Sequence, residues 1–109
     1  MNIEDIRDYA LRKDEVEECF PFGENTLVFK VSGKMFLLVS MECTPLEFNV
    51  KCDPDRAIEL REQHEAVQPG YHMNKKHWNT VIVDGSLADK ELKQMIDESY
   101  QLVRKKGKK

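Results

Sequence analysis

The sequence lacks the patterns that mark several large classes of protein. Its 109 residues contain no apolar run close to the roughly 20 residues that cross a bilayer, and the first residues do not resemble a signal peptide. No glycine-rich phosphate loop, dinucleotide fingerprint or G-x-S-x-G motif occurs. We therefore expect a single cytoplasmic domain over residues 1–109 that enters no membrane, carries no cofactor and is not an enzyme.

Cysteine is scarce and irregularly spaced. Cys19, Cys43 and Cys52 are odd in number, form no C-x-x-C pair and have no histidine close to them in sequence. This spacing favours reduced, mostly buried side chains over a disulfide, redox or zinc role. His72 and His77 stand five residues apart without a third ligand beside them, so we expect no metal site there either.

The net charge of −3 hides an uneven distribution of charge. Residues 1–25 carry eight acidic and three basic side chains, whereas residues 104–109 contain five lysines and arginines. The basic tail at 104–109 is expected either to complement a helix dipole or to attract phosphate. The acidic side chains of the N-terminal region form either a soluble helix face or a ridge that attracts hard cations, and they are Asp5, Asp8, Asp14, Glu15, Glu17 and Glu18.

The hydrophobic periodicity predicts three helices. Asn2 is a helix cap with Asp5 three positions later, and Asp53-Pro54 opens a second helix that runs to about His64. From Asp89 to about Lys105, side chains at helical spacing are expected to face the core, namely Leu92, Met95, Ile96, Ser99, Tyr100 and Val103.

Between these helices the pattern is that of strands. Thr26 to Val31 and Lys34 to Met41 are separated by Ser32-Gly33, which predicts a two-residue hairpin. The next run, from Leu46 to Cys52, alternates and predicts a strand with one solvent-facing side, formed by Glu47, Asn49 and Lys51. Trp78 to Val83 is a further strand before the turn Asp84-Gly85. Consecutive strands between helices predict an α+β two-layer sandwich, an antiparallel sheet with helices packed on one face.

The segment 71–81 is the strongest candidate for a functional site. It holds the single tryptophan, two of the three histidines and a lysine pair. Cations provide salt-dependent affinity for phosphate, and an exposed aromatic ring can stack on an unpaired base. We therefore predict a nucleic-acid-binding segment made of His72, Asn74, Lys75, Lys76, His77, Trp78 and Asn79, with support from Lys30, Lys34 and Lys51 on the strands.

Several segments together resemble the MmcQ/YjbR family of small bacterial proteins. They are Pro21-Phe22-Gly23, residues 71–81 with the N-K-x-H-W-N core at 74–79, the turn Asp84-Gly85 and the helix from Glu91 to Val103. The resemblance spans essentially the whole chain. It implies a fold similar to that of the bacterial frataxin homologue CyaY, in which a curved antiparallel sheet is backed by the N- and C-terminal helices. Family members are commonly labelled DNA-binding proteins, which implies DNA or another polyanion as the partner.

Other interpretations of the same residues stay open. The calculated pI near 5.6 is low for a nucleic-acid binder, so the protein is alternatively a protein-interaction module or a small-anion binder that uses a groove around Tyr71 to Asn79. Trp78 alternatively packs at the start of its strand under the last helix, and the lysine pair alternatively belongs to a solvated loop. We expect the protein to be a monomer.

Overall fold

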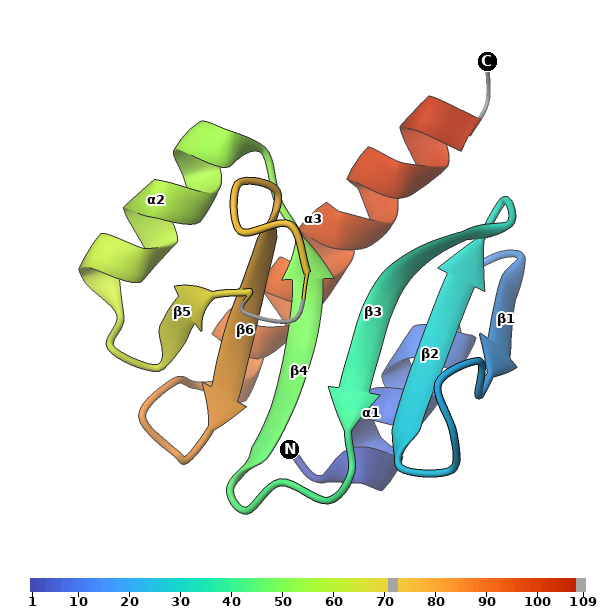
Figure 1. The fold of residues 1–109 in the computed structure, drawn as a ribbon, viewed down its shortest axis with the longest axis horizontal. Coiled ribbons are helices and arrows are strands. Elements are labelled where there is room, and N and C mark those ends of the chain that lie inside the picture. The colour runs from blue at the N-terminus through green and yellow to red at the C-terminus, as the bar shows by residue number, and fades with distance from the viewer. Residues whose placement is uncertain (71–72, 108–109) are drawn as a thin grey trace.

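The computed structural model describes residues 1–70 and 73–107, the last three without their side chains. The elements in chain order are α1 (Ile3–Leu11), β1 (Val16–Cys19), β2 (Thr26–Val31), β3 (Lys34–Ser40), β4 (Leu46–Lys51), α2 (Pro54–Gln63), β5 (Val67–Pro69), β6 (Trp78–Val83) and α3 (Asp89–Gly107). The six strands form one sheet in the order β1-β2-β3-β4-β6-β5, and every neighbouring pair is antiparallel (Figure 1).

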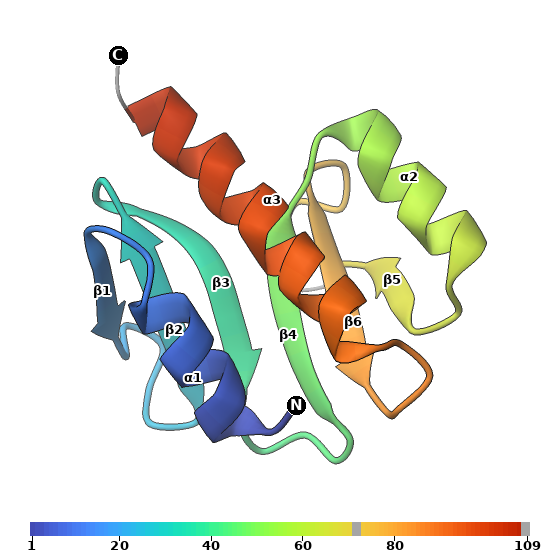
Figure 2. The same cartoon turned by 180° about the vertical axis from the view of Figure 1, so that it is seen from behind.

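The helices and the sheet form two layers. Seen from behind, α1 and α3 lie across one face of the sheet, and α2 lies beside β5 and β6 (Figure 2). Among the described residues, no helix lies on the opposite face (Figure 1). The predicted α+β sandwich, with the N- and C-terminal helices on one face, is confirmed, and the arrangement is consistent with the CyaY-like fold that the resemblance implies. In the described part of the chain, every helix is too short or too polar to cross a membrane.

Local sequence signals account for most element boundaries. The Asn2 side chain accepts a hydrogen bond from the Asp5 backbone, and the Asp5 carboxylate accepts one from the Asn2 backbone, so α1 begins with a reciprocal capping box. Ser32 and Gly33 both have positive φ, 55° and 77°, as the two-residue hairpin between β2 and β3 requires. At α2, Pro54 occupies the first turn as predicted, but the Asp53 side chain makes no capping hydrogen bond.

Two strands were not predicted from the sequence. β1 contains only four residues and β5 only three, and they are the two edges of the sheet. An edge strand pairs with only one neighbour, so it can be short and can contain polar residues or a proline. Its sequence therefore shows no alternating apolar pattern. The sheet therefore has six strands rather than the four that the pattern indicates.

The main core lies between the sheet and the helices. Its fully buried side chains include Phe29, Phe36 and Phe48 from the strands and Ile6 and Ile96 from α1 and α3. The other face of the sheet is less exposed than predicted. Asn49 was expected on a solvent-facing side of β4, but it is only 6 % exposed, and its side-chain oxygen accepts a hydrogen bond of 2.6 Å from the Thr80 hydroxyl on β6.

A single buried hydroxyl joins α3 to the middle of the sheet. The pairing of β3 with β4 ends at Leu37 and Val50, so Phe36 and Lys51 would form the next pair. Instead, the Ser99 hydroxyl donates to the Phe36 carbonyl at 2.5 Å and accepts from the Lys51 backbone N–H at 2.9 Å. Ser99 is fully buried. The helix thus supplies the hydrogen bonds that the two strands no longer make to each other, at the point where they diverge in Figure 1.

Replacing Ser99 by alanine removes both of these hydrogen bonds and leaves a buried carbonyl and a buried N–H without them. We expect S99A to lower the free energy of unfolding by about 1–3 kcal/mol, measured by urea denaturation. The control is Q101A, because Gln101 is an exposed residue of the same helix. Equal stability of S99A and the wild-type protein would show that the Ser99 bridge carries no net energy.

Candidate functional site

A tight turn presents the lysine pair. The Asn74 carbonyl accepts hydrogen bonds from the backbone N–H groups of His77 at 3.1 Å and Trp78 at 2.9 Å. The Asn74 side-chain oxygen also accepts from the Lys76 backbone N–H at 2.9 Å. Lys75 and Lys76 lie between these contacts and are exposed to solvent. The carbonyl and side-chain oxygens of Asn74, which was predicted to bind nucleic acid, are therefore used to shape the turn.

Arg61 of α2 fixes this turn to the body of the protein. Its Nε donates to the Asn79 side-chain oxygen at 2.7 Å, and its Nη2 donates to the carbonyl oxygens of Trp78, at 3.2 Å, and of Lys75. One guanidinium group therefore holds both ends of the lysine-bearing segment. Because its donors are fixed in one plane, these contacts set the orientation of the turn as well as its position.

Asn79 belongs to the interior. It is fully buried, and its side-chain NH2 donates to the Ala57 carbonyl at 3.3 Å and contacts the Cys52 sulfur at 3.8 Å. With Arg61 on its oxygen, the whole amide group is used inside the protein. Asn79 supports the turn and presents no polar atom to a ligand.

Trp78 is also internal, but on the face opposite to the one predicted. It is 7 % exposed and packs with Val28 and Leu38 in a small cluster that includes Met35 and Met73. The helices cover the other face of the sheet, so the expectation that Trp78 packs under the last helix is wrong. Its position as the first residue of β6, opposite Lys51, sets which face the ring occupies.

Gly70 allows the chain to pass close to Trp78. The Gly70 backbone N–H donates to the Trp78 carbonyl at 2.9 Å. A Cβ atom at Gly70 would lie 2.9 Å from the Trp78 Cβ and 3.0 Å from its carbonyl oxygen, which is too close for non-bonded atoms. The segment that carries the lysines therefore starts at a position where only glycine fits without movement of β6.

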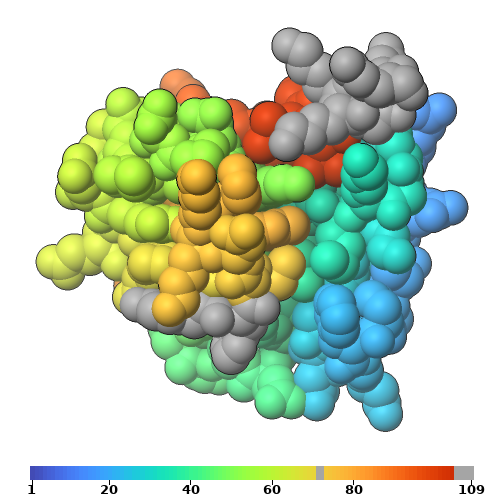
Figure 3. Space-filling view, turned by 45° about the horizontal axis from the view of Figure 1, so that its top comes forward, coloured from blue at the N-terminus to red at the C-terminus, as the bar shows by residue number. Residues whose placement is uncertain are grey.

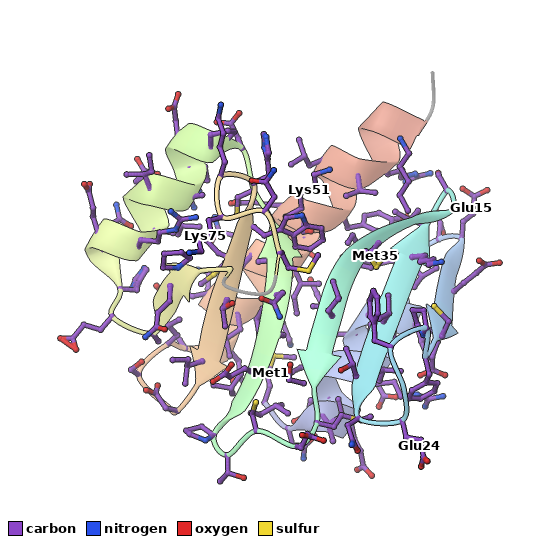
Figure 4. All side chains as sticks on the ribbon, viewed as in Figure 1. Met1, Glu15, Glu24, Met35, Lys51 and Lys75 are labelled. Carbon is purple, nitrogen blue, oxygen red and sulfur yellow. The ribbon has the colours of Figure 1, made fainter. Side chains whose placement is uncertain are left out.

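The remaining predicted site residues occupy different environments. His77 is half-buried, and its carbonyl accepts a hydrogen bond of 2.7 Å from the Cys52 backbone N–H. Lys51 is the last residue of β4. Figure 4 shows it in the same upper part of the molecule as Lys75 of the turn. His72 and Tyr71 lie outside the described residues. Of the predicted set, Lys75 and Lys76 are the charged side chains that the turn exposes.

Charge is segregated between the two ends of the sheet. The end where β2 and β4 finish and β3 and β6 begin carries five lysines, namely Lys30, Lys34, Lys51, Lys75 and Lys76. It also carries the acids Asp14, Glu15 and Asp53, and Lys13 stands in the same connection as the first two. The connections at the opposite end, 20–25, 41–45 and 84–88, contain no lysine or arginine and carry Glu24, Glu42 and Asp84. The lysine-bearing end is the one that attracts anions.

The acidic N-terminal residues do not gather into a metal site in the structure. Asp5 is used in the capping box of α1, and Glu18 forms a two-point ion pair with Arg7, which lowers the pKa of the Glu18 carboxyl. Within residues 1–70 and 73–107, no three His, Cys, Asp or Glu side chains are placed to hold one metal ion.

The thiols of Cys43 and Cys52 are held in their protonated form. Burial raises the pKa of the Cys52 thiol to about 11, and nearby Glu98 adds to this effect. Burial, with Glu47 and Glu42, also raises the pKa of Cys43. A nucleophilic cysteine requires the opposite shift, because the thiolate is the reactive species.

Arg61 is the site residue that the sequence did not reveal. It is 18 positions from Asn79 and stands in an ordinary charged helix, so no local motif marks it. The one available signal was indirect. Asn79 is the amide side chain in the mostly apolar run 78–83, so it requires a hydrogen-bond partner once it is buried, and a long side chain from a neighbouring helix can provide it.

Comparison with known proteins gives consistent matches. The YjbR family model matches residues 11–102. The uncharacterized protein YbdF of Escherichia coli O157:H7 is 40% identical over 95 residues, which cover 86% of this chain and 77% of that protein. The uncharacterized protein YjbR of Escherichia coli K12 is 34% identical over 101 residues, covering 93% of this chain and 86% of that protein.

Solved structures agree with these matches. A crystal structure of a Deinococcus radiodurans protein superposes with a TM-score of 0.92 at 40% identity, covering 97% of this chain and 80% of that chain. A crystal structure of a Pseudomonas syringae protein gives a TM-score of 0.81 at 30% identity, covering 95% of this chain and 100% of that chain.

The role of Arg61 is testable with a variant that keeps its charge. We expect R61K to lose the simultaneous contacts with Asn79, Trp78 and Lys75, because an ammonium group cannot reproduce the planar fork. Amide hydrogen exchange at residues 75–78 should accelerate by about tenfold or more, whereas exchange in β2 and β3 should change little. The control is R12K, since Arg12 is an exposed arginine at the end of α1. Unchanged exchange in R61K would show that the turn holds its shape without the guanidinium.

The buried Cys52 thiol predicts a specific loss of stability in alkali. Its pKa is raised from 9.0 to about 11, so the folded state retains a proton that the unfolded state releases. This contribution is complete below pH 9 and is lost as the pH rises toward 11, and it amounts to about 3 kcal/mol. C52A should flatten this part of the stability profile measured by denaturant unfolding, whereas C19A should retain it. If the stability of C52A and of the wild-type protein fell in parallel between pH 9 and 11, the raised pKa of Cys52 would be contradicted.

Proposed function

The chain belongs to the YjbR family, and we propose that it is a non-enzymatic protein that binds nucleic acid or another polyanion through Lys75 and Lys76. The observation that carries this proposal is the rigid presentation of two adjacent cations. The Asn74 turn and the Arg61 contacts fix the backbone on which both lysines stand. A preformed loop loses less conformational entropy when it binds, so more of the electrostatic attraction appears as affinity.

The proposed contacts are to phosphate rather than to bases. The Trp78 ring and the Asn79 amide, which are suited to base stacking and base recognition, are used within the fold. Lysine ammonium groups recognise phosphate as point charges and carry little sequence information. Binding through this turn should therefore be insensitive to sequence and similar for duplex and single-stranded DNA of equal charge density.

The acidic pI is compatible with a local phosphate site. Lys51 lies at the same end of the sheet as the turn and extends its positive charge. At moderate ionic strength, fields decay over about 10 Å, so the acidic connections at the far end weaken the attraction only slightly. With about three phosphate contacts the affinity should be modest.

A protein-interaction module is the second candidate function, and it rests on a different surface. Phe20 and Phe22, in the loop between β1 and β2, are 51 % and 61 % exposed. Two neighbouring exposed aromatic side chains are unusual on a monomeric surface and typical of protein interfaces. Binding through these rings would depend little on salt.

Fluorescence anisotropy with labelled DNA tests the polyanion proposal. For about three phosphate contacts, the affinity for duplex DNA should fall roughly 40-fold between about 50 and 200 mM salt. K75E/K76E should abolish the binding, because it removes two contacts and adds two repulsive charges. The matched control is K90E/K93E, which makes the same charge change on exposed lysines of α3 and should lower the affinity much less.

Two results would reject this function. One is the absence of salt-dependent binding at low salt, and the other is binding that K75E/K76E retains. An F20A/F22A variant separates the candidates further, since polyanion binding should survive it and binding of a protein partner should not.

A further inference from the structure

The uncovered face of the sheet contains a groove of about 510 Å³. Leu38 on β3, with Met73 and Phe22, gives the groove an apolar floor, and Asn49 on β4 adds one polar residue to it. The rims come from residues 23–25 and from the connection after β3. In Figure 3 the turn that follows Met73 (orange) projects from the molecule, and the segment around residues 20–25 (blue) rises across from it. The volume lies within the usual range for sites of small organic ligands, roughly 300–1,000 Å³.

The groove combines an apolar floor with negative charge at its rim. Leu38, Met73 and Phe22 provide the apolar contacts. Glu24 and Glu42 stand on two different connections, and both are exposed. Within the described residues, neither carboxylate forms an ion pair, and none of the groove-lining residues is basic. Unneutralised carboxylates next to an apolar floor repel anions and favour a ligand with a positive head and an apolar body.

We propose that this groove binds a small organic cation, namely a primary amine carried by an aromatic or aliphatic body. The ammonium group pairs with Glu24 and Glu42, and the apolar body lies on Leu38 and Met73. Asn25, Thr26 and Ser40 offer polar atoms between these two regions. Met73 lines the groove and leads into the Lys75–Lys76 turn, so the two sites are neighbours. The carboxylates of the groove stand on other connections, and its ligand has the opposite charge to the one proposed for the turn.

A metal ion fits the same groove poorly. Hard cations such as calcium take about six to eight oxygen ligands, several of them carboxylates. The groove lining contains two glutamates, and no cluster of three ligating side chains exists in the described part of the chain. The apolar floor would contribute nothing to binding a metal ion, whereas it would contribute to binding an organic amine.

Cys43 provides a built-in reporter of occupancy. It lines the groove and is half-buried, whereas Cys52 is buried beneath the sheet. In a C19A background, Cys43 is therefore the accessible thiol, and a bound ligand should slow its reaction with a maleimide. E42Q changes the pKa of Cys43 itself, since Glu42 contributes to raising it. Protection is therefore measured as the ratio of rates with and without ligand within each variant.

The probes are tryptamine, tryptophol and indole-3-acetate, which share a ring and differ in the charge of the head group. We expect tryptamine to slow the Cys43 reaction and to shift the amide NMR signals of Leu38 and Asn49, with tryptophol and indole-3-acetate at least about tenfold weaker. E24Q/E42Q should reduce the affinity for tryptamine by about tenfold. The control E62Q/E65Q neutralises two exposed glutamates of α2 and the residues after it and should leave the affinity unchanged.

Three outcomes would overturn the proposal. They are equal protection by all three compounds, no protection and no NMR shift with any of them, and tryptamine binding that E24Q/E42Q retains. The K75E/K76E variant should bind tryptamine at least as tightly as the wild-type protein, because it adds negative charge close to Met73. The groove and the polyanion site therefore stand or fall independently.

Discussion

The arrangement of the candidate site depends on one side chain, Arg61. Its guanidinium joins α2 to β6 through Asn79 and holds the lysine-bearing turn through two backbone carbonyls. These hydrogen bonds go to neutral oxygen atoms rather than to a carboxylate, so the contact does not cancel the arginine charge. The same group that gives the turn its shape also adds positive potential beneath it. Asn79, which looks like a ligand-binding residue in the sequence, is the internal counterpart of this contact.

A second constraint explains why one face of the sheet is covered and the other is open. Ser99 takes the place of strand pairing between Phe36 and Lys51, so α3 is held directly against the middle of the sheet. α1 packs on the same face and is tied to α3 through Tyr9, whose hydroxyl donates to Asp97 at 2.6 Å. Burial and the hydrogen bond to Asp97 raise the pKa of Tyr9 to about 12, so the hydroxyl keeps its proton well into alkaline solution. With both terminal helices on one face, the residues that the structure places on the other face are Trp78, its small apolar cluster and the neighbouring loops.

The features that the sequence predicted are those that local residues determine. The Asn2–Asp5 capping box, the Ser32-Gly33 hairpin and the periodicity of α3 each depend on residues a few positions apart, and each is present. The features that were missed depend on partners distant in sequence. β1 and β5 are defined by pairing with β2 and β6, and the face that Trp78 occupies depends on which side the helices cover. The Arg61–Asn79 contact and the groove combine residues from several elements, so no short segment contains either signal.

The antiparallel order of the strands converts a scattered pattern of charge into a molecule with two different ends. Successive connections fall at opposite ends of the sheet. In this chain one end gathers most of the lysines of the strands and of the turn after Met73, together with a few acids, whereas the connections 20–25, 41–45 and 84–88 at the other end carry two glutamates and an aspartate without a lysine or arginine. A net charge of −3 therefore says little about which ions the surface attracts locally, because screening confines each end to its own surroundings. Such a polarity also orients the protein toward a charged partner before contact, since one end is attracted and the other repelled. The lysine turn and the groove are neighbours, since Met73 lines the groove and leads into the turn, but the carboxylates of the groove, Glu24 and Glu42, stand on connections at the other end of the sheet. The same open face therefore offers positive charge at one end and negative charge at the other.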